Sequence, residues 1–215
     1  VATEGPVILS RTLTRGLQDT LAGGYDVVAG TQMALRALDY ADVTFAALAN
    51  ADTAMNLPDF RASERTYRTI RRMLQPSAAS RRVLIQTFHP GHYAVAAAAA
   101  DDYEAFAERE LAFRRRLELP PYTHLVNVVV VERKAAVSAK ADEIAARLRE
   151  MFVPPATVLG PVPAPVARAR GERRWQILVK AELGEIESAA GELAALVRRK
   201  GPTTVKVDVD PYELF

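Results

Sequence analysis

The amino-acid sequence predicts an α/β protein made of two successive parts. Its 215 residues exceed the roughly 100–200 residues of one typical domain, which favours two small domains. In both parts, apolar segments of strand length alternate with segments of helical character. The pair Pro120 and Pro121 separates the two parts, because proline ends the helix that precedes it.

The first part contains apolar runs bounded by turn residues, which predict buried strands at residues 7–10, 26–30, 43–52 and 83–88. Residues 12–24 predict a short helix between the first two strands. Strands that alternate with helices imply a mainly parallel sheet covered on both faces. Because the alternation is too short for a complete doubly wound domain, we expect a fragment of a larger one.

Residues 92–117 are rich in alanine and other strong helix formers, with apolar residues at roughly helical spacing. This pattern predicts one long helix. The expected organisation is therefore a first domain at residues 1–90, a connecting helix and double-proline junction at 91–120, and a C-terminal domain at 121–215.

The second part predicts strands and helices in the order strand 123–132, helix 135–152, strand 156–169, strand 173–182, helix 184–200 and strand 203–210. Prolines bend the path of the strand at 156–169. Both helices carry apolar residues three and four positions apart, for example Ile144 and Leu148. A β-α-β-β-α-β order with both helices on one face predicts a ferredoxin-like sandwich.

Composition excludes several classes of protein. No apolar run approaches the ~20 residues needed to span a bilayer, and no signal-peptide pattern opens the chain, so we expect a cytoplasmic protein without a membrane partner. The absence of cysteine excludes disulfides, thiol catalysis and thiolate zinc sites. A net charge of +2 is too small to indicate nucleic acid by itself. Residues 61–118, however, carry 11 basic and 7 acidic side chains. The local distribution of arginine must therefore decide whether the chain binds nucleic acid.

The first arginine cluster lies in a predicted helix. Arg65, Arg68, Arg71 and Arg72 recur at spacings that place them on one helical stripe. Two interpretations remain open, a solvated helix face or a contact with DNA backbone phosphates. Under the second interpretation, Arg65, Arg68 and Arg72 bind nucleic acid.

The second arginine cluster joins two predicted strands. Arg168, Arg170, Arg173 and Arg174 surround a glycine, and Trp175 follows at once. Arginine supplies forks for phosphate, and tryptophan supplies a stacking face for single-stranded or branched nucleic acid. We therefore predict that these four arginines bind nucleic acid. Trp175 has two open interpretations, a stacking residue or the start of an apolar core strand.

Longer motifs carry a resemblance to a known family. GTQM at 30–33 follows a predicted strand, and PDFRASER at 58–65, LELPPY at 117–122 and RWQ at 174–176 come after it in this order. Together they resemble the primosomal protein N′ (PriA) family of replication-restart DNA helicases, over practically the whole chain. The resemblance implies a partial RecA-like helicase lobe, followed by a ferredoxin-like domain similar to ribosomal protein S10.

The resemblance also implies a function in primosome assembly. The expected partners are DNA forks and junctions of single-stranded with duplex DNA, together with single-stranded-DNA-binding protein and primosome proteins. In the family, the strand bearing RWQ lies near the pocket for the acidic tail of single-stranded-DNA-binding protein, which implies partner binding by Arg174, Trp175 and Gln176. Glu172 stands where the family often has arginine, and its carboxylate would repel an acidic peptide.

The helicase motifs depart from the family pattern. Gly30, Thr31 and Gln32 match a loop that couples nucleotide to DNA, but the lysine, glycine and histidine that usually follow are missing. The glycine-arginine loop that would reach the γ-phosphate is also missing from residues 69–82. An arginine finger contributes about 10³–10⁵ in turnover, so we expect a catalytically inactive member with no catalytic residue in this chain. The alternative is an ATP-dependent 3′–5′ DNA helicase in the full-length protein.

The family uses ATP and zinc through residues that this chain lacks. We therefore expect no cofactor and no metal site here, and a location in the cytoplasm with the nucleoid. Two further alternatives are a regulatory module for a small molecule and, by analogy of fold, RNA binding.

Overall fold

The structure, a computed structural model, describes residues 7–9, 27–30, 43–74, 82–132, 139–169, 172–197 and 203–214. The chain divides into two compact units. The first comprises residues 1–57 and 61–108, and the second comprises residues 58–60 and 109–215. The short segment Pro58–Phe60 therefore belongs to the second unit although its neighbours in sequence belong to the first.

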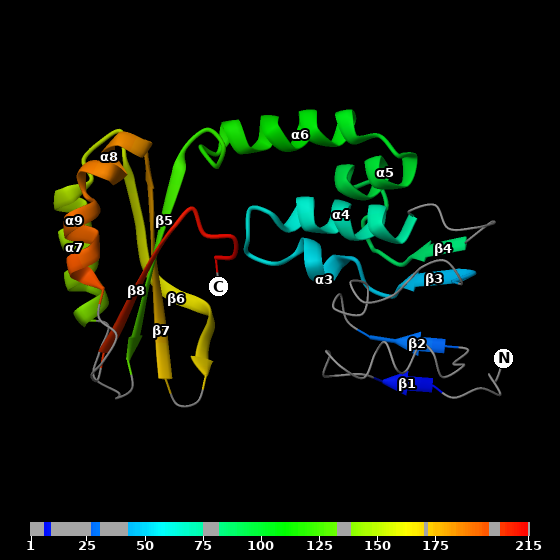
Figure 1. The fold of residues 1–215 in the computed structure, drawn as a ribbon, viewed down its shortest axis with the longest axis horizontal. Helices are drawn as coiled ribbons and strands as arrows, with labels where there is room; N and C mark the ends of the chain where they lie inside the picture. The colour runs from blue at the N-terminus through cyan, green and yellow to red at the C-terminus, as the bar shows by residue number, and fades with distance from the viewer. Residues whose placement is uncertain are drawn as a thin grey trace. The chain divides into compact units, whose positions relative to one another are not determined.

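The first unit contains parallel strand pairs and helices (Figure 1). Its described strands are β1 (Val7–Leu9), β2 (Val27–Ala29), β3 (Phe45–Leu48) and β4 (Arg82–Ile85). β1 pairs with β2 and β3 pairs with β4, both in parallel, which confirms the predicted strands and their direction. The helix predicted at 12–24 lies outside the described residues. The α/β fold class is confirmed.

Helices cover one face of the β3–β4 pair. They are α3 (Asp52–Met55), α4 (Ala62–Leu74) and α5 (Tyr93–Ala100). The buried residues of α4 lie on one face of the helix. Two of them, Tyr67 and Ile70, pack into a core with Ala94 of α5. The Tyr67 ring stacks on Phe106 with ring centroids 4.2 Å apart.

The expectation of one continuous helix over residues 92–117 is wrong. The structure has α5 and a separate helix α6 (Tyr103–Arg116). Asp101 ends α5 with a left-handed φ of 59°, and the Asp102 carboxylate accepts a hydrogen bond from the backbone of Ala105 at 2.9 Å. Short carboxylate side chains compete with the helix for backbone groups, so this aspartate pair overrides the helix propensity of the alanines.

The second unit has the predicted order of elements. These are β5 (His124–Glu132), α7 (Ala139–Met151), β6 (Thr157–Ala169), β7 (Glu172–Ala181), α8 (Leu183–Ser188), α9 (Ala190–Leu196) and β8 (Thr203–Val209). The four strands form one antiparallel sheet in the order β6-β7-β5-β8. The β-α-β-β-α-β order, which defines ferredoxin-like domains, is confirmed.

The last predicted helix is divided in two, contrary to the expectation of one helix over 184–200. Ala189 ends α8 and precedes α9. The hydroxyl of Ser188 donates to the carbonyl of Gly184 at 2.7 Å. Such a bond from a serine to the carbonyl four residues earlier bends helices. Residues 198–200 lie outside the described part of the chain.

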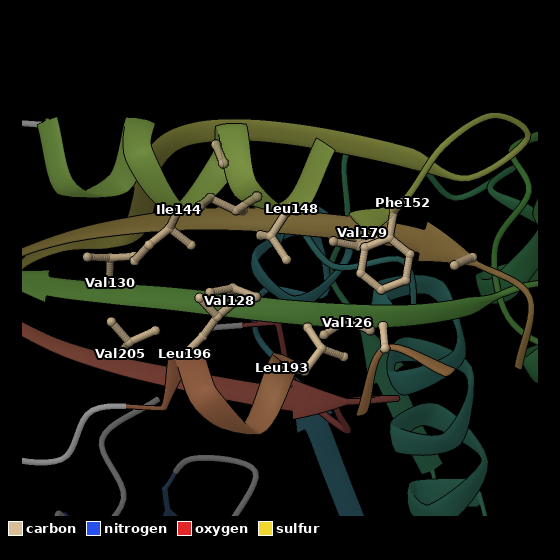
Figure 2. Packing of buried hydrophobic residues seen from close by; sticks show 14 of the residues in the cluster. Val126, Val128, Val130, Ile144, Leu148, Phe152, Val179, Leu193, Leu196 and Val205 are labelled. Carbon is tan, nitrogen blue, oxygen red and sulfur yellow. The ribbon is translucent and has the colours of Figure 1, made fainter. Parts of the chain in front are cut away.

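The core of the second unit lies between the sheet and its helices. Figure 2 shows alternate valines of β5 pointing towards Ile144 and Leu148 of α7 and towards Leu193 and Leu196 of α9. Val126, Val128 and Val130 are completely buried. This packing assigns the even-numbered residues of β5 to the helix-covered face.

Strand β6 follows the bent path that its prolines predict. Its pairing with β7 shifts register between Leu159 and Val162 and again between Pro163 and Arg168. Gly160 has φ of 96°, and a Cβ there would lie 2.7 Å from the carbonyl oxygen of Gln176. Only glycine fits this close approach without a shift of the backbone. Beyond the second irregularity, β6 again pairs with the start of β7.

We predict that Leu148→Ala lowers the free energy of unfolding of the second unit by about 2–5 kcal/mol, because it leaves a cavity in this core. Val153→Ala, at a side chain that is 58% exposed, should change it by less than about 0.5 kcal/mol. Urea unfolding followed by the fluorescence of Trp175, which packs against the same core, measures both. Equal effects of the two variants would contradict the assigned packing.

Candidate functional site

The arginine cluster around residue 171 lies where β6 and β7 meet. Arg168 pairs with Arg173 across the two strands, and Ala169 pairs with Glu172. Arg170 lies outside the described residues, as does the side chain of Arg168. The sequence therefore brings the backbones of three of the predicted arginines, Arg168, Arg173 and Arg174, to one end of the sheet.

Successive side chains of a strand point to opposite faces of the sheet, so the site residues predicted in β7 lie on two different faces. Trp175 packs against the helix-covered core together with Ile177 and Val179. Arg174 and Gln176 alternate with these residues and so belong to the opposite face. The Trp175 side chain is half-buried, and its Nε1 is buried without a hydrogen-bond partner in the described chain. These core contacts agree with the interpretation of Trp175 as the start of an apolar core strand.

The Gln176 amide contacts the C-terminal segment of the chain itself. Its Nε2 donates to the Leu214 carbonyl at 2.6 Å and to Asn127 Oδ1 at 2.9 Å. Asn127 Nδ2 donates to the same carbonyl at 3.2 Å. The backbone N–H of Leu214 faces Asp59 Oδ2 at 3.5 Å. The Leu214 carbonyl of the C-terminal segment thus engages the Nε2 of Gln176.

A buried carboxylate faces the arginines. Glu132, the last residue of β5, pairs with Arg173 of β7 and is only 4% exposed. Burial raises the pKa of Glu132, and the nearby Arg173 guanidinium opposes that rise. Its Oε2 has no hydrogen-bond partner in the described chain, and the same holds for Arg174 Nε. Sequence reasoning missed Glu132, although it ends an apolar run opposite two arginines.

The remaining carboxylate at this end is Glu172. Its Oε2 lies 3.6 Å from Arg174 Nη2. Both side chains retain some exposure, at 23% for Glu172 and 36% for Arg174. A partly exposed pair of this kind is worth about 0–1 kcal/mol, so the arginine remains available to a stronger anion.

The predicted arginines of α4 share its outward face. With ~100° between successive residues of a helix, Arg65, Arg68 and Arg72 fall within an arc of roughly 60°, opposite the buried residues of α4. The Arg68 side chain is 62% exposed and lies 3.7 Å from Glu64. Arg71 lies outside this arc, where it forms an ion pair with Asp101 and donates to the Ala98 carbonyl, both beyond the end of α4.

The degenerate helicase motif is described only at its first residue. Gly30 is exposed and follows β2, whereas Thr31 and Gln32 lie outside the described residues. Within the described residues, no group of three or more histidine, aspartate and glutamate side chains is arranged to hold a metal ion. None of the helices in that part of the chain combines the length and apolar character of a membrane span.

A buried ion pair within α6 lies beside Phe60, a residue of the PDFRASER motif that belongs to the same unit. Glu110 accepts from Arg114 at 2.8 Å within α6, and both side chains are at most 10% exposed. The Arg114 guanidinium lies 5.0 Å from the centre of the Phe60 ring. Sequence reasoning missed this contact, because only the spacing of Glu110 and Arg114 is visible in sequence.

Comparisons with known proteins agree with the resemblance found in the sequence. Residues 115–212 match the family model described as the primosomal protein N C-terminal domain. The replication restart protein PriA of Bacillus subtilis is 30% identical over 90% of this chain, and that of Treponema pallidum is 35% identical over 90%. The protein of the same name from Haemophilus influenzae is 29% identical over 92% of the chain. The chain spans only 25%, 30% and 28% of the lengths of these three relatives.

We predict that Glu132 makes the chain less stable as the pH rises. Because burial raises the pKa of Glu132 in the folded state, the folded chain keeps a proton that the unfolded chain releases. Stability is therefore lost as the pH rises from the ordinary carboxylate range, about 4.3, through the raised pKa. Glu132→Gln stays neutral, so wild type should lose stability relative to this variant over that interval.

Urea unfolding of both proteins between about pH 4 and pH 8 measures this difference, and the comparison cancels the other titrating groups. Glu143→Gln is the control, because Glu143 is exposed and, among the described residues, pairs with Lys140 of the same helix. A difference between wild type and Glu132→Gln that does not vary with pH would contradict the assigned burial.

Proposed function

Because the chain belongs to the replication restart protein PriA family, as a C-terminal portion, we propose that it binds branched DNA at stalled replication forks and recruits primosome partners. The observation that carries the proposal is the convergence of arginines at one end of the β6–β7 hairpin. Arg168 and Arg173 are cross-strand neighbours, and Arg174 follows in the same strand. Arginine forks match the geometry of phosphate oxygens, so the DNA backbone is the ligand that fits this end of the sheet.

The balance of charge at the hairpin supports this assignment. The segment 168–174 contains four arginines, and the two carboxylates that the structure describes at this end of the sheet are Glu132, which pairs with Arg173, and Glu172, which lies near Arg174. Burial raises the pKa of Glu132, so this carboxyl takes up a proton at a higher pH than an ordinary one. The hairpin end therefore keeps an excess of positive charge, as a phosphate-binding surface needs.

The α4 arginines supply a second surface in the proposal. Arg65, Arg68 and Arg72 lie along one outward helical face, so they could follow a phosphate backbone. A merely solvated helix face is the competing interpretation, and the salt dependence of DNA affinity separates the two. Arg71 is not part of the proposed surface, because Asp101 and the Ala98 carbonyl engage its guanidinium.

The first unit is proposed to be the remnant of a second RecA-like helicase lobe without catalytic activity. The reason is chemical. An arginine that stabilises a transferring phosphoryl group must be held on a tight loop aimed at the nucleotide. The sequence after α4 has no glycine-arginine loop, and Arg71 in α4 is already paired with Asp101. On this account the family's ATP and zinc are bound by parts of the longer protein outside this chain.

Partner binding is proposed for Arg174, Trp175 and Gln176, with single-stranded-DNA-binding protein and primosome proteins as partners. Arg174 supplies the positive charge that an acidic peptide requires. Gln176 is available only if Leu214 leaves its amide, and Trp175 lies on the other face. The neighbouring carboxylate of Glu172 weakens the attraction. We further propose a fold similar to ribosomal protein S10 and a location in the cytoplasm with the nucleoid.

We predict that Arg170→Gln, Arg173→Gln and Arg174→Gln combined reduce the slope of log affinity against log salt by about 2–3, since each phosphate contact contributes about 0.9 on duplex and 0.7 on single strands. Fluorescence anisotropy with a labelled forked DNA at several salt concentrations gives the slope. Lys140→Gln with Arg147→Gln, on α7, is the control and should change it little. An unchanged slope in the triple variant would remove the hairpin from the DNA interface.

The alternative function is ATP-dependent 3′–5′ unwinding by the full-length protein. This alternative concerns proteins as long as the relatives, of which the chain spans only 25% and 30%. We predict that the full-length protein containing this chain shows no DNA-stimulated ATP hydrolysis. Release of phosphate measured with and without forked DNA is the test, and stimulation by DNA would favour the helicase.

A further inference from the structure

The C-terminal half of α6 carries three arginines that the proposed function does not use. Arg109, Arg115 and Arg116 are all exposed, and all three belong to the second unit. Arg114, which lies between them, forms the buried ion pair with Glu110. Within the described part of the chain, the other three arginines form no ion pair with a carboxylate.

The spacing of residues along α6 explains this difference. Glu110 precedes Arg114 by four residues, the distance at which helical side chains meet. The positions four residues before Arg115 and Arg116 hold leucine and alanine. The two arginines therefore keep their full charge at the surface.

Arginines near the end of a helix often serve only to offset its dipole. The last carbonyls of α6 have other donors. The backbone N–H of Leu119 donates to the Arg114 carbonyl at 2.9 Å, and that of Glu118 donates to the Arg115 carbonyl at 3.2 Å. Just beyond the helix, Lys180 Nζ donates to the Leu117 carbonyl at 2.7 Å. The helix end is thus closed without the side chains of Arg115 and Arg116.

Aromatic rings orient both guanidinium groups. The Cζ atom of Arg115 lies 4.7 Å from the centre of the Tyr122 ring, and that of Arg116 lies 5.9 Å from the centre of the Phe113 ring. Both distances are within the ~6 Å range of cation–π attraction. An arginine stacked in this way keeps its N–H groups free, and it loses less conformational freedom when a ligand binds.

We propose that Arg115 and Arg116 form a further binding site for the phosphodiester backbone of DNA. The proposal rests on the DNA-binding function proposed above and adds a surface to it. Among the described residues neither guanidinium group has a carboxylate partner, and oriented guanidinium groups match phosphate oxygens. Phe113 beside them is 37% exposed, and Leu111 and Leu117 are 40% and 41% exposed. These side chains offer unstacked bases an apolar surface, which duplex DNA would not use.

The test is the double variant Arg115→Gln/Arg116→Gln in the full chain. The control Lys140→Gln/Arg147→Gln removes the same charge from α7, where the two side chains are 34% and 51% exposed. Affinity is measured for a labelled single strand and for a duplex across a range of salt concentrations. Loss of two phosphate contacts should reduce the log–log slope by about 1.4 on the single strand and about 1.8 on the duplex. Circular dichroism verifies that both variants fold.

The outcomes separate this inference from the function on which it rests. If the α6 variant keeps the slope of the control while the hairpin variant loses slope, the α6 site is wrong and DNA binding stands. If the wild-type chain binds neither DNA, both proposals fail. A reduced slope on one DNA but not on the other assigns the site to that form of DNA.

A second variant tests the role of the ring without changing charge. Tyr122→Leu removes the surface under Arg115, so DNA affinity should fall about two- to five-fold, the equivalent of one exposed cation–π contact. The salt slope should stay as in wild type. Unchanged affinity in this variant would contradict the orienting role of Tyr122.

Discussion

The register of the central strand β5 is the constraint on which the rest of the second unit depends. β5 pairs with β7 on one side and β8 on the other, and its even-numbered valines are completely buried under α7 and α9. A slip of one residue would move these valines to the other face of the sheet, at the cost of the whole core. Hydrophobic burial thereby fixes where the polar residues at the end of the sheet lie.

The chemistry at that end follows from the register. The register places the buried carboxylate of Glu132 opposite Arg173. It also brings the backbones of Arg168, Arg173 and Arg174 together at one end of the sheet. The same alternation separates Trp175, which packs on the core, from Gln176, whose amide binds the carbonyl of Leu214. The Leu214 carbonyl engages Gln176 and Asn127 on the open face, and the arginines proposed to bind an anionic ligand lie at the hairpin end and on α4 and α6.

The sequence was sufficient to predict the order of elements in the second unit, because its apolar spacing changes clearly between strand and helix. It was insufficient where local propensity competes with capping. Alanine favours an unbroken helix through residue 101, yet Asp101 and Asp102 end one helix and begin the next. Contacts between distant residues were also invisible in sequence. Neither the position of Asp59 beside Leu214 nor the burial of Glu132 follows from any local pattern.

Hydrogen–deuterium exchange of the chain with and without forked DNA tests the central claim most directly, because it reports where DNA protects the backbone. Our account predicts slower exchange at residues 166–176, where β6 and β7 meet, with residues 139–151 of α7 unchanged. Protection confined to α7, or no protection at the hairpin when DNA is bound, would contradict it.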